Sequence, residues 1–425
     1  MNVERNDEVS RQLQDARRRT RALTRDLDGT QLLGPKLAIV NPALWELGHV
    51  AWFQERWCLR LRSDESLSES LLAGADGLYD SSAVAHDTRW DLALPTLTAT
   101  LDYQDRVLED VLARVRREPD NEWLMYFVQL ALFHEDMHAE AFHYTRQTLG
   151  YSDPLCPANR SDAEAGAIPG DVEFPGGRFV LGALRNTGFH FDNEKWAHSV
   201  RVRPFRIARA PVTNREYLEF VREGGYQRRE WWSEEGWRWR EEARARAPLY
   251  WAEHGGAWRE RSFADWTSLA NDLPVMHVNW HEANAYCRYA GRRLPSEAEW
   301  EFAAAYSGDD SKRRYPWGDV ADRARVNLDS SCRAPVSGFA EGDSLAGCRQ
   351  MLGNIWEWTS STFAPYPGFV CDPYREYSVP WFGTRKVLRG GSFSTPKRLV
   401  HNMWRNFYTP DRGDIFAGFR TCAIE

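Results

Sequence analysis

The spacing of apolar residues changes between residues 150 and 171, and this change constrains the fold more than any other feature of the chain. Before it, apolar residues recur at intervals of three and four, which is typical of helices that bury one face. After it, short apolar runs alternate with Gly, Pro and Asn, which is typical of short strands and turns. We therefore predict an α+β fold with a helical domain over residues 1–155, a linker over 156–170 and a mixed domain over 171–425.

Four helices are expected in the first domain, and their number favours a four-helix bundle. The last of them ends at Gly150, a residue suited to a helix C-terminus, and the second is predicted to begin with Asn41 as its N-cap. The expected helices cover residues 8–27, 42–61, 97–115 and 121–149. Their inward residues are predicted to be Val9, Leu13, Ala16, Thr20, Leu23 and Leu27; Leu97, Leu101, Leu108 and Leu112; and Trp123, Phe127, Leu130, His134, His138 and Ala141.

The second domain is expected to contain strands over residues 177–182, 200–207 and 386–388, and helices over 214–223 and 296–305. The last helix begins with the capping-box pair Ser296 and Glu299. Residues 222–266 are dense in Arg, Glu and Trp. This stretch is either a ligand groove or a charged insertion packed on the domain, and we favour the insertion.

Composition and charge exclude several classes of protein. The chain has 54 Lys and Arg against 61 Asp and Glu, a net charge of −7, which argues against a nucleic-acid partner held by a basic face. The chain contains no run of 18 apolar residues, so no membrane span is expected. Residues 1–25 lack the apolar centre of a signal peptide. The seven cysteines include no CxxC pair, which favours a reducing compartment. We predict a cytoplasmic protein with no nucleic-acid or membrane partner.

Two histidines one helical turn apart, His134 and His138, are the sharpest candidate for a metal site. At this spacing both rings reach one ion, and imidazoles suit Fe, Zn, Cu or Ni. His49, among apolar neighbours on another predicted helix, would complete a three-histidine set with open coordination positions. Glu135, Asp136 or backbone oxygens are candidates to orient the rings. The alternatives are core histidines with ordinary partners, or a zinc hydrolase, since the string also fits H-E-x-x-H.

A series of motifs connects both halves of the chain to known families. The first half resembles DinB-like bundles, and the second resembles the formylglycine-generating-enzyme (sulfatase-modifying-factor) domain, which has a C-type-lectin-like fold. The motifs of the second half lie at residues 174–177 (FPGG), 211–214 (PVTN), 274–280 (PVMHVNW), 291–301 (GRRLPSEAEWE), 315–319 (YPWGD), 353–358 (GNIWEW), 388–392 (LRGGS) and 418–420 (GFR).

The order of the two domains, together with the three histidines, resembles the ergothioneine-type sulfoxide synthases. The resemblance implies a non-haem Fe(II) enzyme that uses O2 to join a sulfur donor to the imidazole C2 of hercynine, with His49, His134 and His138 as iron ligands. Tyr374 would be the proton donor. The hercynine-binding residues would be Tyr377, Asn406, Phe407 and Tyr408, which follow the family motifs at residues 373–378 and 404–408.

The chain departs from these synthases where they bind the sulfur donor. Met137 stands where many of them carry Gln, and residues 78–95 lack their tyrosine pair and have Arg89 as their only arginine or lysine. Asp80, Ser81, His86 and Asp87 offer instead groups that suit hydroxyls. With these substitutions at residues 78–95, the chain resembles the selenoneine synthases, which take selenium from a selenosugar.

Other interpretations stay open. The donor is a selenosugar in our preferred hypothesis and a thiol, cysteine or γ-glutamylcysteine, in the alternative. Arg412 either meets the donor or pairs with Asp411 or Asp414. A zinc hydrolase and a simple binding module are more distant hypotheses. Lectin-like domains of this kind often carry structural Ca²⁺, whose ligands the sequence does not assign.

Overall fold

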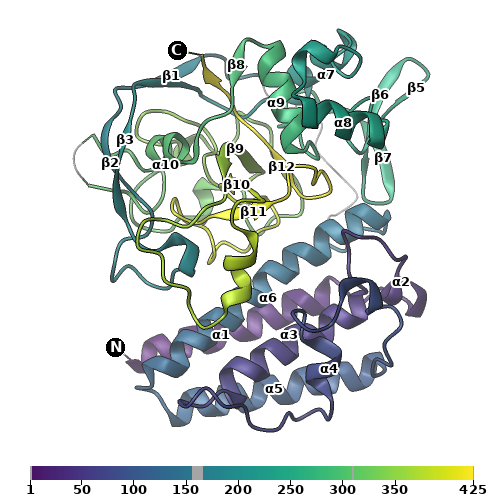
Figure 1. Ribbon diagram of the computed structural model, residues 1–425, viewed down its shortest axis with the longest axis vertical. Helices are drawn as coiled ribbons and strands as arrows, with labels where there is room; N and C mark the ends of the chain where they lie inside the picture. The colour runs from purple at the N-terminus through teal and green to yellow at the C-terminus, as the bar shows by residue number, and fades with distance from the viewer. Residues whose placement is uncertain (1, 156–165, 309–310, 425) are drawn as a thin grey trace. The chain divides into compact units, whose positions relative to one another are not determined.

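The chain folds into two compact units, Met1–Leu155 and Cys156–Glu425. The computed structural model describes residues 2–155, 166–308 and 311–424 (Figure 1). The first unit is helical and the second combines short strands with helices, so the predicted α+β class is confirmed. Residues 156–165 of the predicted linker lie outside the described residues, and the linker stays a prediction.

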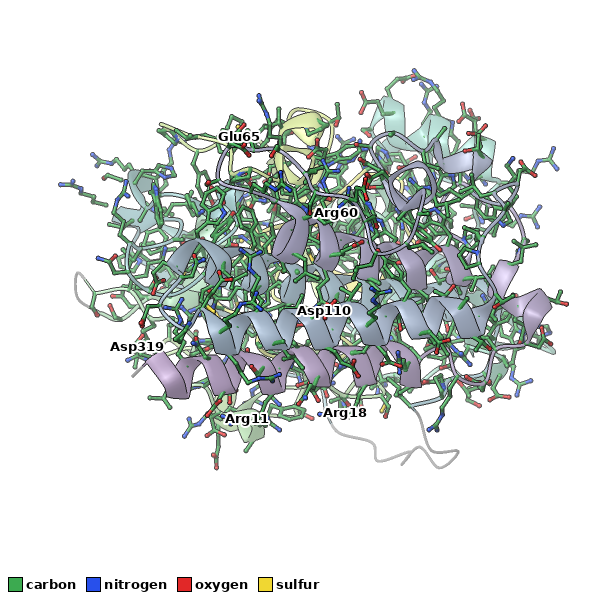
Figure 2. All side chains as sticks on the ribbon, turned by 90° about the horizontal axis from the view of Figure 1, so that it is seen from below. Arg11, Arg18, Arg60, Glu65, Asp110 and Asp319 are labelled. Carbon is green, nitrogen blue, oxygen red and sulfur yellow. The ribbon has the colours of Figure 1, made fainter. Side chains whose placement is uncertain are left out.

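Four long helices lie side by side in the first unit (Figure 1). They are α1 (Asn2–Ala22), α3 (Ala43–Glu55), α5 (Leu97–Arg117) and α6 (Glu122–Leu149). A π-helical turn, η1 (Arg56–Arg60), extends α3, and shorter elements connect the long ones: α2 (Gly29–Leu33), α4 (Ala75–Tyr79) and η2 (His86–Thr88). The six inward residues predicted for the first helix are all buried, but α1 ends at Ala22 rather than near residue 27, so Leu23 and Leu27 follow the helix. In Figure 2, Arg11 and Arg18 point away from the bundle on the opposite, exposed face of α1.

The predicted inner face of α5 is wrong in part. Leu112 is buried, but Leu97, Leu101 and Leu108 are only half-buried. The face that packs inward instead includes three polar residues, and the two large ones find partners inside the bundle: Gln104 donates to the Leu47 carbonyl at 2.8 Å and Tyr103 to Glu55 at 2.5 Å. The buried residues of this face are Thr100, Tyr103, Gln104, Val107, Val111 and Val115.

The ends of the helices test the predicted caps. Asn121 accepts from the Leu124 N–H as the N-cap of α6, and Gly150 ends that helix with a φ of +67°, as expected. The predicted N-cap of α3 is wrong. Pro42 occupies that position, and the side-chain amide oxygen of Asn41 accepts from the guanidinium of Arg89. On α6, Trp123 is 46% exposed rather than buried, because it lies in the first turn.

Two four-stranded sheets form the centre of the second unit. One has the order β1-β4-β13-β8, made of β1 (Asp171–Phe174), β4 (Phe205–Ala208), β13 (Cys422–Ala423) and β8 (Arg292–Arg293). The other has the order β11-β10-β9-β12, made of β11 (Asn406–Tyr408), β10 (Lys386–Arg389), β9 (Trp356–Thr362) and β12 (Ala417–Gly418). A separate two-stranded ribbon is made of β2 (Gly177–Leu181) and β3 (His198–Val202). The single strand predicted over residues 200–207 is therefore wrong: it is interrupted at Arg203 and Pro204, and its two parts belong to different sheets.

Four helices accompany these sheets (Figure 1): α7 (Asn214–Arg222), α8 (Glu234–Ala243), α9 (Trp280–Tyr289) and α10 (Glu297–Ala305). The first and last confirm the sequence prediction, and the Ser296–Glu299 capping box is present. The charged stretch 222–266 folds into α8 and part of a small sheet of β5 (Trp251–His254), β6 (Ala257–Ser262) and β7 (Asp265–Ser268). In the described part of the chain, no helix is long and apolar enough to cross a membrane.

Candidate functional site

His49 of α3 and His134 and His138 of α6 come together inside the helical unit. One nitrogen of each ring lies within 4.8 Å of the others, and the ring centroids are 4.5 to 5.0 Å apart. The two histidines of α6 share one face because they are four residues apart, and α3 packs directly on that face. The three rings thus point toward one shared point.

Two oxygen atoms orient two of these rings. The backbone oxygen of Tyr79 lies 2.8 Å from His49 Nδ1, and a carboxylate oxygen of Glu46 contacts His138 Nδ1. An imidazole that donates its Nδ1–H in this way presents the Nε2 lone pair, as metal-binding histidines usually do. Gly48 makes the first contact possible, since a Cβ there would lie 2.2 Å from Cζ of Tyr79.

Burial favours the neutral form of two of these rings. It lowers the pKa of His49 and of His134 well below the ordinary value, and the nearby His138 lowers both further. Aromatic neighbours hold the rings in place: Phe53 stacks on His134 with 3.6 Å between centroids, and Trp45 on His49 with 4.8 Å. Three imidazoles, two of them with an oriented second nitrogen, fit a transition metal of the Fe, Zn, Cu or Ni type.

The carboxylate of the H-E-x-x-H string serves another purpose. Both oxygens of Glu135 accept from Arg17, at 2.7 and 3.1 Å, and both side chains are buried. A zinc hydrolase needs this carboxylate as a general base beside the metal-bound water. In this protein it is held in an ion pair that joins α1 to α6. Glu46, which no sequence motif indicated, is the carboxylate that contacts His138.

The predicted donor segment is largely engaged within its own unit. Arg89 lies 3.9 Å above the ring of Trp45 and donates to Asn41 at 2.7 Å, and its side chain is buried. His86 Nε2 lies 2.7 Å from the Val40 carbonyl oxygen. Asp80 accepts from Ser82 and lies 3.6 Å from Arg56. Met137, next to His138 on α6, is half-buried.

In the second unit, the predicted hercynine residues form an aromatic cluster. The ring of Tyr377, in η7 (Arg375–Tyr377), lies 6.2 Å from Tyr374 and 5.7 Å from Phe407. Phe407 stacks on Phe363 with 4.0 Å between centroids. Burial, and then the charge of Glu194, raise the pKa of Tyr377 well above its ordinary value, so its hydroxyl stays protonated.

Strand β11 contributes the rest of this group. Asn406, Phe407 and Tyr408 pair with β10, and all three are half-buried. The guanidinium of Arg412 lies 5.1 Å from the Tyr408 ring and is bound by Asp414 at 2.5 and 2.6 Å. Of the two partners that the sequence left open for Arg412, the structure shows Asp414.

Comparison with known proteins connects both units to families. Residues 158–424 match the sulfatase-modifying factor enzyme 1-like domain, and residues 12–142 match the DinB superfamily, which confirms the predicted fold class. The chain is 37% identical to a hercynine oxygenase of Mycolicibacterium thermoresistibile, over 97% of this chain and 94% of that one. It is 36% identical to a hercynine oxygenase of Mycolicibacterium smegmatis, over 95% and 96%. A formylglycine-generating enzyme of Streptomyces coelicolor is 35% identical over 60% of this chain and 88% of its own.

Proposed function

Since this chain belongs to the family of the hercynine oxygenases, we propose that it is a metal-dependent oxygenase that acts on hercynine and O2. The observation that carries the proposal is the buried cluster of His49, His134 and His138, whose ligand atoms lie within 4.8 Å of one another. These residues would hold the metal. We propose Fe(II), since activation of O2 calls for a redox-active ion and three imidazoles suit iron.

The aromatic cluster of the second unit supports hercynine as substrate. A quaternary ammonium packs favourably on aromatic faces, and Tyr377 and Phe407 offer such faces. Asn406 and Tyr408, on the same strand as Phe407, are proposed to receive the carboxylate by hydrogen bonds. Tyr374 is proposed as the general acid that gives its Oη proton during the reduction of O2.

For the second substrate we propose a selenosugar, so that the product carries a new C–Se bond at the imidazole C2. The support comes from Arg89, because its guanidinium is buried, stacked on Trp45 and bound to Asn41. A donor with carboxylates needs a cation there, whereas a sugar needs hydrogen-bond groups such as Asp80 Oδ2 and His86 Nδ1, which the contacts with Ser82 and Val40 leave over. Arg412, already paired with Asp414, would contact a donor only through its remaining N–H groups. A thiol donor, giving a C–S bond, is the alternative.

A competition experiment tests the function and the donor together. The Fe(II)-loaded chain receives hercynine without oxygen, then selenosugar, thiosugar, cysteine and γ-glutamylcysteine at equal concentration, then O2. We expect mass spectrometry to find a hercynine adduct that contains selenium and the sugar. A sulfoxide derived from cysteine or γ-glutamylcysteine would overturn the donor assignment and leave the oxygenase assignment intact. No adduct, with iron bound, would overturn the hercynine assignment.

Tyr374→Phe tests the proposed acid. We expect the variant to keep its iron and its hercynine affinity but to lose the adduct or divert to another product, since it lacks the Oη proton. Tyr289→Phe is the control, because Tyr289 is a half-buried tyrosine of the same unit that lies outside the cluster. Unchanged coupling in Tyr374→Phe would remove this residue from the chemistry.

A further inference from the structure

The second unit contains another cluster of buried metal-binding side chains, which no sequence motif indicated. His190, Glu194 and His401 offer ligand atoms that all lie within 4.8 Å of one another. Their exposed fractions are 2%, 1% and 6%. Glu194 closes the short helix η3 (Asp192–Glu194), and His401 lies in the loop between β10 and β11.

The hydrogen bonds around His190 place a lone pair on its Nδ1. The Thr187 hydroxyl donates to the Leu184 carbonyl at 2.7 Å, so its oxygen accepts from His190 Nε2–H at 2.8 Å. A neutral imidazole with its proton on Nε2 has an unprotonated Nδ1. This Nδ1 is buried and has no hydrogen-bond partner among the described residues.

The carboxylate of Glu194 faces that lone pair. Its Oε1 accepts from the Phe191 N–H at 3.0 Å, which fixes the carboxylate. Its Oε2 lies 3.5 Å from His190 Nδ1 and 3.4 Å from His401 Nε2, and no described group makes a hydrogen bond to it. Two buried acceptors that face each other are costly unless a cation or a proton lies between them.

We propose that His190, Glu194 and His401 bind a divalent transition-metal ion of the zinc or iron type. Two imidazoles and one carboxylate are an ordinary ligand set for such ions, and three protein ligands leave a position for water or a small molecule. His401 is the weakest ligand. Its Nδ1 accepts from the Met403 N–H at 3.2 Å, and binding the ion through Nε2 gives up that hydrogen bond.

The ion would join two segments that are far apart in the sequence and lie next to the aromatic cluster. Phe191, in the segment that carries His190 and Glu194, packs on Tyr377 with 4.5 Å between ring centroids. A metal at this point would therefore hold one wall of the cluster in place. The site is separate from the three-histidine site, whose ligands all belong to the helical unit.

The test removes the first site from the full-length chain and counts the metal that remains. A His134→Ala/His138→Ala chain is loaded with Zn²⁺, desalted and analysed by mass spectrometry for metals. We expect about one zinc ion per chain, and a melting temperature that rises with zinc. No zinc above a desalted blank would overturn the proposal and favour a proton shared between His190 and Glu194.

Glu194→Gln in the same background identifies the ligand. Gln keeps the size of Glu and an oxygen for the Phe191 N–H, and its amide can donate to His190 Nδ1, so the fold should persist without metal. We expect the zinc and the zinc-dependent rise in melting temperature to be lost. His198→Gln, a histidine on β3 outside the cluster, should keep both. If the parent background does not fold, the unsubstituted chain should hold about two ions and Glu194→Gln about one. Equal zinc in Glu194→Gln and its parent would overturn the site.

Discussion

At the scale of the residue, Glu46 supports the three-histidine site without being one of its three histidines. Its carboxylate holds His138 Nδ1 and so orients that ring. Glu46→Gln keeps the shape but loses the charge, so we expect metal affinity to fall by about 10- to 100-fold with the fold retained. Anaerobic titration with Fe(II) or Co(II) measures it. Glu109→Gln, on the exposed side of α5, is the control, and equal affinities in the two variants would refute the role of Glu46.

The sequence indicated the three histidines of this site, but not the residues that hold them in place. The spacing of His134 and His138 is local, so it is visible in the chain itself. Glu135 is adjacent to His134 in sequence, but its partner is Arg17, 118 residues away, and no local pattern shows that pair. Glu46 lies three residues before His49, so the two side chains share one helix face, and this spacing is a local signal in the sequence.

At the scale of the element, one buried guanidinium joins the four long helices. Arg17 of α1 donates to Glu135 of α6, to Gln54 of α3 and to the Gln104 carbonyl of α5. Arg17→Met leaves the Glu135 carboxylate buried without its cation, and we expect a loss of about 3–5 kcal/mol in the stability of the helical unit. Urea unfolding followed by circular dichroism measures this loss. Arg18→Met, on the exposed face of α1, should change it by less than about 0.5 kcal/mol.

A double variant separates the cost of the unpaired charge from the loss of packing. Arg17→Met/Glu135→Gln removes both charges, so part of the stability should return. If the double variant is less stable than Arg17→Met, the pair does not act as an ion pair.

The short helix α4 is held by a second ion pair, and this pair responds to acid. Asp76 accepts from Arg60 at 2.7 Å and from the Trp52 indole at 2.6 Å, and these bonds, Arg60 first, lower its pKa to about 2 despite partial burial. The folded pKa is below the ordinary value of 3.8, so the stabilisation is complete above about pH 4 and is lost as the pH falls toward 2.

Asp76→Asn should therefore cost about 1 kcal/mol at pH 7, since solvent screens a side chain that is 49% exposed, and should have almost no effect at pH 2. Urea midpoints at the two pH values measure the difference, with Asp102→Asn on α5 as the exposed control. A cost that is the same at both pH values would refute the assignment.

Elements were predictable where their ends carry a local signal. The helices α6, α7 and α10 have side-chain caps that are visible in sequence, and all three were found. The helices α8 and α9 were missed, although Asn279 and Glu282 form a capping box at the start of α9. The inner face of α5 was misjudged because Tyr103 and Gln104 are buried through long-range hydrogen bonds, which an apolar pattern does not contain.

At the scale of the whole molecule, the two units are proposed to supply different parts of one activity: the metal from the first and the hercynine contacts from the second. A substitution in one unit should then impair only the part of the activity that this unit supplies. Phe407→Leu removes an aromatic face that a quaternary ammonium would use, and we expect the hercynine KM to rise by roughly 3- to 30-fold with metal content unchanged. His138→Ala should instead remove the metal of the three-histidine site and leave the second unit intact.

Steady-state kinetics and metal analysis of the same preparations measure this separation. Phe369→Leu is the matched control for Phe407→Leu, because Phe369 is a half-buried aromatic residue that packs on Phe382, outside the contacts of Tyr377 and Phe407. If Phe407→Leu lowers kcat and leaves KM unchanged, the ring acts on a later step than binding. If it also removes metal, the two units do not act separately, and the division of labour proposed here is wrong.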